Sequence, residues 1–70
     1  MNVKINGEQK RLEGPVPVFE LLTQLGLDPS KVAVERNREI VPRSMYQNIM
    51  VAEGDEFEIV HFIGGGNVAL

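Results

Sequence analysis

Three consecutive glycines, Gly64-Gly65-Gly66, stand near the end of the 70-residue chain and are the residues best suited to chemistry. They follow an alternating stretch, residues 57–61, that is typical of a β-strand, and only residues 67–70 come after them. Glycine has no Cβ atom, so this segment can enter a channel too narrow for other residues and bring its backbone close to a bound nucleotide. The pattern suggests a backbone presented as a substrate. A frayed terminus is the plainer interpretation, which these three residues alone favour.

The rest of the chain offers few side chains for catalysis. It has no cysteine, which excludes disulfides, a thiol nucleophile and thiolate metal ligands, and its one histidine, His61, cannot form a histidine cluster. We interpret the carboxylates before and within the last strand as a solvated acidic turn; they are Glu53, Asp55, Glu56 and Glu58. No phosphate-binding glycine motif, metal-ligand spacing or nucleophile triad is present. The sequence therefore predicts no enzyme active site, no metal site and no cofactor of its own.

Composition and charge limit the class of protein and its partners. A chain of 70 residues with 43% hydrophobic and 24% charged residues is typical of one small globular domain. Lys and Arg number 7 against 10 Asp and Glu, so the net charge of −3 argues against nucleic-acid binding. No apolar run approaches the roughly 20 residues of a membrane span, and the first residues lack the apolar core of a signal peptide. We expect a cytoplasmic protein that does not bind membranes.

The elements that position the glycines begin with a β-hairpin and a helix. Asn6-Gly7 supplies the two positive-φ positions of a tight hairpin turn, and the returning arm, residues 8–13, is predicted to be a charged edge strand. Gly26 suits the left-handed position after the end of a helix, and Pro17 suits its first turn. The helix has four apolar residues spaced to share one face, which we expect to cover a sheet: Val18, Leu21, Leu22 and Leu25.

Two further strands and a helical turn are predicted in the middle of the chain. Residues 32–35 form a buried strand, and a short strand at Ile40-Val41 ends at Pro42. Residues 43–48 form one helical turn with Ser44 as its cap, and three apolar side chains there cover the open end of the core: Met45, Tyr46 and Ile49.

The last strand separates core residues from a predicted docking surface. Alternation places Phe57 and Ile59 on the core face and Val60 and Phe62 on the opposite, more exposed face, close to the glycines. Large exposed apolar residues beside a flexible end indicate a docking patch. We therefore predict Val60, Phe62 and Ile63 as partner-binding residues.

The order of elements predicts an α+β fold, with one main helix across a curved mixed sheet of about five strands. We assign residues 1–63 to this domain and residues 64–70 to a flexible, glycine-rich tail, because no packing side chain is available among the glycines.

Three motifs stand out along the chain: Asn6-Gly7 after a short first strand, the stretch ERNREIVPRS at residues 35–44, and EGDEFEIV at residues 53–60 leading to the glycines. Together they resemble the ThiS-type sulfur carriers of thiamine biosynthesis, in the ubiquitin-like β-grasp ThiS/MoaD family. The molybdopterin carriers also end in Gly-Gly and are the alternative, but they are usually longer and lack the stretch VPRS at residues 41–44.

The resemblance implies a protein co-substrate and not an enzyme. An E1-like adenylyltransferase of the ThiF type would use ATP and Mg²⁺ to adenylate the carboxylate of Gly66, and sulfur from a persulfide donor would displace AMP to leave a thiocarboxylate. A ThiG-type thiazole synthase would then take that sulfur. Gly64 and Gly65 would form the thread that carries Gly66 to these partners. Family members end at the glycines, whereas here residues 67–70 follow, so they must be removed before Gly66 can react.

Two other classes of function remain open from the residues alone. A ubiquitin-like binding module without sulfur chemistry would depend on Val60 and Phe62 and not on Gly66. A β-grasp domain of the RNA-associated kind is the other, and the acidic charge balance and few aromatic residues argue against it.

Overall fold

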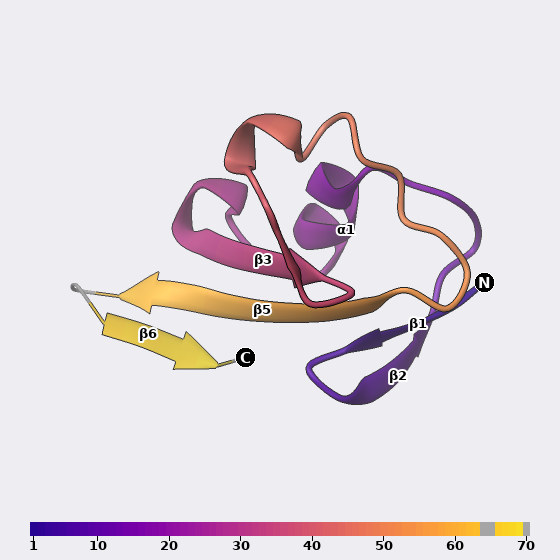
Figure 1. Ribbon diagram of the computed structural model, residues 1–70, viewed down its shortest axis with the longest axis horizontal. Helices are drawn as coiled ribbons and strands as arrows, with labels where there is room; N and C mark the ends of the chain where they lie inside the picture. The colour runs from indigo at the N-terminus through magenta and orange to yellow at the C-terminus, as the bar shows by residue number, and fades with distance from the viewer. Residues whose placement is uncertain (64–65, 70) are drawn as a thin grey trace.

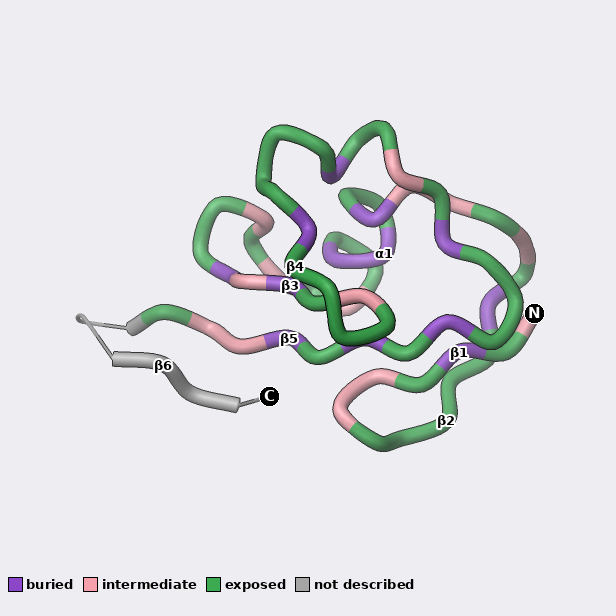
Figure 2. The backbone as a smooth tube through the Cα atoms, in the orientation of Figure 1, coloured by how far each residue is buried: buried purple, intermediate pink, exposed green. Residues whose placement is uncertain are grey.

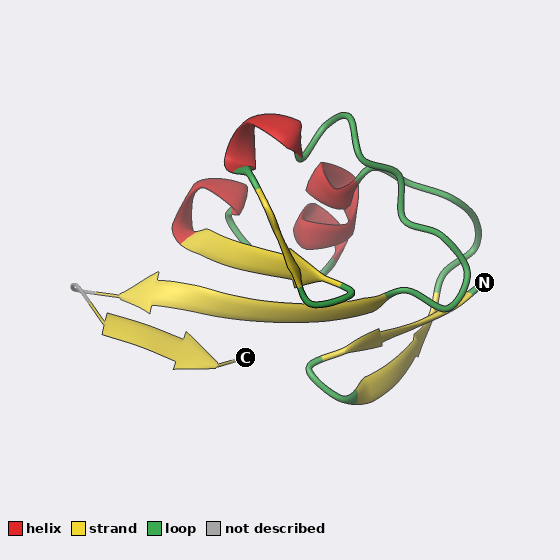
Figure 3. Ribbon diagram, in the orientation of Figure 1, coloured by secondary structure: helices red, strands yellow, loops and turns green. Residues whose placement is uncertain are grey.

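The computed structural model describes residues 1–63 and 66–69, with side chains as far as Phe62. The elements are β1 (Asn2–Ile5), β2 (Glu8–Arg11), α1 (Val18–Gln24), η1 (Pro29–Lys31), β3 (Val32–Arg36), β4 (Glu39–Val41), η2 (Arg43–Met45), β5 (Glu56–Ile63) and β6 (Gly66–Ala69). Figure 3 shows that α1 and the two short helical turns lie on one side of the strands. This confirms the predicted α+β architecture, in which one helix crosses a mixed sheet.

Strand β5 is the centre of the sheet. The strand order is β2-β1-β5-β3-β4, with β6 beside β5 (Figure 1). β1 and β5 are parallel, and the other strand pairs are antiparallel. The charged strand β2 is at one edge, as predicted, and it ends at Arg11, two residues before the predicted limit.

Positive-φ residues form the turns where the sequence predicts them. Asn6 and Gly7 have φ angles of 52° and 84°, which confirms the tight hairpin turn between β1 and β2. Gly26 has a φ of 78° after the end of α1, as predicted. A second turn of this kind, at Asn37 and Arg38, with φ angles of 51° and 69°, joins β3 to β4.

The core lies between α1 and the face of the sheet toward it (Figure 2). Cross-strand neighbours share a face, and one buried row runs across the sheet through Val41, Val34 and Ile59. From α1, three of the four predicted apolar residues are buried and Leu25 is partly buried. The buried hydrophobic residues are Val3, Leu12, Val18, Leu21, Leu22, Val32, Val34, Val41, Tyr46, Val51, Phe57 and Ile59.

The start of α1 differs from the prediction that Pro17 lies in its first turn. Pro17 is the N-cap residue and does not belong to the first helical turn, and no side chain caps the helix. The N–H groups of Val18 and Phe19 donate instead to the carbonyls of Ile49 and Tyr46, at 2.9 and 2.8 Å. These bonds satisfy N–H groups that a helix leaves without partners of its own, and they fix α1 against the loop before β5.

The predicted helical turn at residues 43–48 is shorter in the structure, and its cap is different. η2 covers Arg43–Met45, its N-cap is Pro42, and no side chain caps it, so the prediction of Ser44 as cap is wrong. Proline has a fixed φ suited to starting a turn, and the carbonyl of Pro42 accepts a hydrogen bond from Met45 N at 2.8 Å. Tyr46 is buried and Ile49 packs partly against the core, as predicted, whereas Met45 is 38% exposed.

The segment predicted as a flexible tail is partly a strand in the structure. β6 pairs with β5 in antiparallel register, with Gly66 opposite Ile63 and Ala69 opposite Val60. Residues 64, 65 and 70 lie outside the described residues, so the predicted thread of Gly64 and Gly65 does too. The flexibility of residues 64–70 stays a prediction.

Candidate functional site

A partly apolar surface lies on the face of the sheet opposite α1. Because alternate residues of a strand face opposite sides, the buried Phe57 and Ile59 place Val60 and Phe62 on this outer face. Val60 is partly buried and Phe62 is 41% exposed. Both lie on the face predicted for them, while the side chain of Ile63 lies outside the described part of the chain, and the docking role of all three stays a prediction.

Cross-strand register identifies the neighbours of these two residues. Ala33 on β3 is directly opposite Val60. One row further along β5, Glu35 lies between Glu58 on β5 and Ile40 on β4. We call the surface formed by these residues the open face: Ala33, Glu35, Ile40, Glu58, Val60 and Phe62.

Ile40 belongs to the open face and was not predicted as a binding residue. Its side chain is 78% exposed, more than that of any other large hydrophobic residue in the described part of the chain. The signal was present in the sequence: in a short strand at Ile40-Val41, burial of Val41 requires that Ile40 face the other way. An exposed Ile beside Glu35 and Glu58 gives the open face an apolar surface with an acidic centre.

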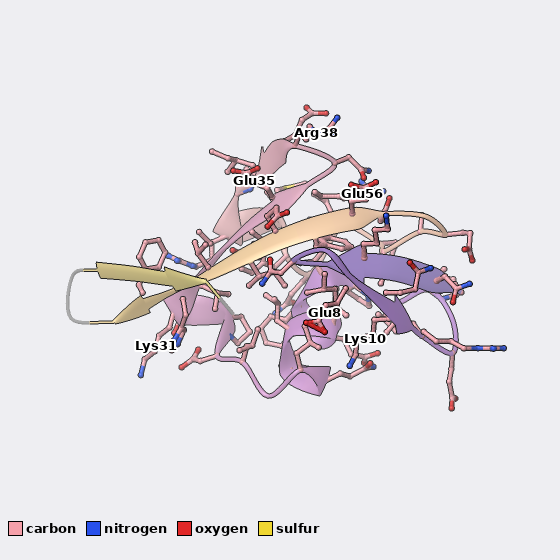
Figure 4. The ribbon with its side chains drawn as sticks, turned by 90° about the horizontal axis from the view of Figure 1, so that it is seen from below. Glu8, Lys10, Lys31, Glu35, Arg38 and Glu56 are labelled. Carbon is pink, nitrogen blue, oxygen red and sulfur yellow. The ribbon has the colours of Figure 1, made fainter. Side chains whose placement is uncertain are left out.

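Figure 4 shows on which strands the labelled charged residues lie. Glu35 and Glu56 lie on the neighbouring strands β3 and β5, and Arg38 lies at the tip of the β3–β4 hairpin. Glu8 and Lys10 lie on β2, at the opposite edge of the sheet. Because Glu35 and Glu58 are the charged residues of the open face, it suits a partner with a basic surface.

Asp55 is not part of a solvated acidic turn, and that interpretation is wrong for this residue. Asp55 is 5% exposed, and its carboxylate accepts hydrogen bonds from Arg36 Nε at 2.9 Å, Ala52 N at 2.8 Å and Asn37 Nδ2 at 3.1 Å. Burial alone would raise the pKa of Asp55, but these hydrogen bonds and the charge of Arg36 outweigh it and hold the pKa below its ordinary value. The other three carboxylates, of Glu53, Glu56 and Glu58, belong to exposed residues, as predicted.

The Asp55 carboxylate connects the start of β5 to the β3–β4 hairpin. Asn37, in the turn of that hairpin, accepts a hydrogen bond from Glu56 N at 3.0 Å with its side chain and donates its own N–H to Glu56 O at 2.8 Å. Arg36 is the partner of Asp55 in the one salt bridge found among the described residues. These contacts fix the beginning of the strand that leads to the glycines.

Asn6 performs a similar function in the middle of β5. Its side-chain oxygen accepts a hydrogen bond from Ile59 N at 2.8 Å, and its Nδ2 donates to Ile59 O at 3.2 Å. β1 ends at Ile5, so the Asn6 side chain takes the place of the next residue of a paired strand. The sequence indicated Asn6 only as a turn residue, and this contact between residues 53 positions apart has no local signal.

The described residues offer no metal site and no membrane span. Among them, no group of three or more His, Asp or Glu residues could hold a metal ion. In the same part of the chain, no helix is long and apolar enough to cross a membrane. The predicted reacting residue, Gly66, lies in β6, beyond the end of β5 that forms the open face.

Comparison with known proteins identifies the family. The ThiS family model matches residues 3–66, so the match ends at Gly66. Thiazole synthase of Paramagnetospirillum magneticum is 52% identical over 67 residues, which are 96% of this chain and 21% of that protein. Sulfur carrier protein ThiS of Bacillus subtilis is 43% identical over 49 residues, which are 70% of this chain and 74% of that protein.

Solved structures agree with this result. A crystal structure of the thiamine biosynthesis protein ThiS from Geobacter metallireducens superposes with a TM-score of 0.81 and 35% identity, and it covers 94% of this chain and 100% of that one. The chain spans about a fifth of the length of the matched thiazole synthases. Its fold is the ubiquitin-like β-grasp, and the chain belongs to the ThiS family of sulfur carrier proteins.

Proposed function

We propose that this protein carries sulfur for thiamine biosynthesis as a thiocarboxylate on Gly66. The observation that carries the proposal is the family match, which begins in β1 and ends at Gly66. The geometry supports it, because the central strand β5 is fixed at its start and middle and leads directly to the glycines.

The chemistry needs a carboxylate and two partners but no catalytic side chain from the carrier. In an E1-like adenylyltransferase of the ThiF type, the Gly66 carboxylate attacks the α-phosphate of ATP, forming the acyl adenylate and releasing pyrophosphate, while Mg²⁺ neutralises charge on the phosphates. The terminal sulfur of a protein persulfide attacks the activated carbonyl and AMP leaves. A thiol then attacks the donor's sulfur in the resulting S–S bond, forms a disulfide with the donor and releases the thiocarboxylate. The carrier is in this sense a co-substrate of other enzymes.

The acceptor in this proposal is a thiazole synthase of the ThiG type. Two relatives bearing the name thiazole synthase align with 96% and 94% of this chain but with only 21% and 20% of their own length. A carrier-like segment within a protein of that name supports a functional link between carrier and synthase. We place this protein and these partners in the cytoplasm.

The open face is the proposed docking surface for the activating enzyme. Phe62 and Ile40 expose large apolar side chains there, and aromatic residues in particular supply binding energy at protein interfaces. Val60 and Ile63 precede and follow Phe62 on the same strand. A partner bound to these residues receives the glycines immediately beyond them.

Gly66 can react only when the chain ends there. In the 70-residue chain its carbonyl is part of a peptide bond to Asn67, and an amide, stabilised by resonance, has no oxyanion to attack the α-phosphate of ATP. We therefore propose that the residues after Gly66 are removed by hydrolysis before sulfur loading.

Mass spectrometry of three forms tests this function. Each form is incubated with a ThiF-type enzyme, ATP, Mg²⁺ and a persulfide donor. A chain ending at Gly66 should gain the mass of one oxygen-to-sulfur exchange. A chain ending at Gly65 also has a glycine carboxylate but is shorter by about 3.3–3.6 Å, so it should react much less, and the 70-residue chain should not react. Sulfur on the 70-residue chain at its own terminus would refute the assignment of Gly66.

A further inference from the structure

The hydrogen-bonding side of β5 that faces β1 can be followed residue by residue. Lys4 N donates to Asp55 O at 2.9 Å, and Asn6 N donates to Phe57 O at 2.8 Å. The Asn6 side chain then takes both backbone groups of Ile59. Since backbone groups alternate sides along a strand, the odd-numbered residues of β5 face β1, and the next in the series are His61 and Ile63.

These two residues meet β6 because β1 has already ended. β6 pairs Val68 with His61 and Gly66 with Ile63, and the alternation makes these the pairs that exchange backbone hydrogen bonds. The intervening pair, Asn67 with Phe62, is then a non-hydrogen-bonded pair. Figure 1 shows β6 running back along β5 toward the β1–β2 turn, so the chain after Gly66 does not continue in the direction of β5.

We propose that β6 is an autoinhibitory strand: its pairing with the edge of β5 withholds Gly66, and the peptide bond from Gly66 to Asn67, from partner enzymes. This inference rests on the proposed role of Gly66. An adenylating enzyme needs the glycines extended in its own channel. An endopeptidase binds its substrate as an extended segment that pairs with the enzyme, and the backbone groups of Gly66 and Val68 are not available for this while they pair with β5.

The reaction class that this strand controls is peptide-bond hydrolysis. Water adds across the bond between Gly66 and Asn67, the Gly66 carbonyl becomes the carboxylate and the Asn67 nitrogen becomes a free amine. The strand is only four residues long and lies beside β5, so its opening needs no unfolding of the core. Opening of β6 therefore sets how often the bond becomes available.

Two proline variants of the 70-residue chain distinguish the effect of breaking the β5–β6 pairing from the effect of adding a proline to β6. Val68→Pro removes an N–H that points at His61 and breaks the pairing, whereas Ala69→Pro places the same residue at a position whose N–H points away from β5. Hydrogen exchange followed by NMR gives the first readout. In Val68→Pro, and in a chain ending at Gly66, the His61 amide should exchange about tenfold faster or more than in the 70-residue chain. Ala69→Pro should retain most of the protection.

Two amides report on the rest of the fold in the same spectra. Val60 N–H faces β3, and Ile59 N–H is held by Asn6, so neither should change in any variant. Equal exchange of His61 in the 70-residue chain and the chain ending at Gly66 would overturn the autoinhibitory strand.

Limited proteolysis with subtilisin gives the second readout, with cleavage of the bond between Gly66 and Asn67 quantified by intact mass. Val68→Pro should be cut there several-fold faster than Ala69→Pro, and equal rates would also contradict the inference. The sulfur carrier role is tested separately by the chain ending at Gly66, which lacks β6. If that chain takes up no sulfur, the proposed function fails, but the result says nothing against the pairing of β6 with β5.

Discussion

Replacement of Asp55 by asparagine tests the explanation of how β5 is fixed. The carboxylate of Asp55 accepts three hydrogen bonds, one of them from the Arg36 guanidinium. Asparagine has the same shape but one acceptor oxygen fewer and no charge, so at least one of the three donors loses its partner. A hydrogen bond to a charged group contributes about 1.5–3 kcal/mol, and loss of one partner of a buried pair costs about 3–5 kcal/mol.

The expected loss lies below the upper end of these ranges because the side chain of Arg36 is 32% exposed and can be hydrated when its partner is neutral. We expect Asp55→Asn to lower the free energy of unfolding by about 2–3 kcal/mol at pH 7. For a domain of this size that corresponds to a fall in Tm of about 10–20 °C. Glu56→Gln is the matched control, because it removes one negative charge from an exposed neighbour, and it should change the free energy of unfolding by less than about 0.5 kcal/mol.

The pH dependence separates the ionised carboxylate from the shape of the side chain. The pKa of Asp55 is lower in the folded protein than in the unfolded chain, so its contribution is complete above the unfolded value of about 3.9 and is lost as the pH falls through the folded value. Urea unfolding should be followed by circular dichroism at pH 7 and at successively lower pH. The free energies of unfolding of the original protein and Asp55→Asn should become equal in acid. A loss under about 1 kcal/mol at pH 7, or a difference that does not shrink in acid, would refute this account of the Asp55 contacts.

Three further predictions test other parts of the structure. Phe62→Ala should weaken binding of the activating enzyme by about 1–3 kcal/mol in titration calorimetry while the fold remains stable. Ile59→Ala, in the buried row, should instead destabilise the fold by about 2–5 kcal/mol. Unfolding of Phe62→Ala would show that Phe62 belongs to the core. Asn6→Gly keeps the positive φ but removes both side-chain bonds to Ile59, so it should cost about 1–3 kcal/mol, and an Asn6→Gly protein as stable as the original would exclude that role for Asn6. Tyr46→Phe removes the hydroxyl that donates to Val32 O at 3.1 Å and should cost about 0.5–1.5 kcal/mol, since Arg43 also donates to that carbonyl, at 3.3 Å; a loss above about 3 kcal/mol would mean that Arg43 does not satisfy it.

Much of the fold is predictable because its signals are local. The hairpin at Asn6-Gly7, the apolar face of α1 and the alternation of β5 each depend on residues within a few positions of one another, and all three are confirmed. The burial of Asp55 was missed because it depends on Arg36 and Asn37, which lie 19 and 18 residues away. An acidic residue beside Gly54 is typical of an exposed turn unless a distant cation covers it.

The candidate site was predictable in part for the same reason. Alternation is enough to place Val60 and Phe62 opposite the core, but the addition of Ile40 requires knowledge that β4 pairs with β3 and β3 with β5. The pairing of β6 was missed because glycines and a short extension contain no apolar alternation. Its position depends on the end of β1 at Ile5, which leaves the edge of β5 available at His61 and Ile63.

In the proposed function, β5 links docking to delivery, because the glycines follow Phe62 of the open face closely in the sequence. From Phe62 to Gly66 is four residues, which extend over at most about 13–14 Å. An enzyme that binds the open face at Phe62 must therefore hold its nucleotide within that distance of the bound side chain. When β6 pairs with β5, Gly66 lies opposite Ile63, so its distance from Phe62 is much shorter than in the extended chain. If the open face and β6 have the roles proposed above, docking and release of β6 are separate requirements, and we expect a partner that satisfies only the first to bind the carrier without gaining access to Gly66.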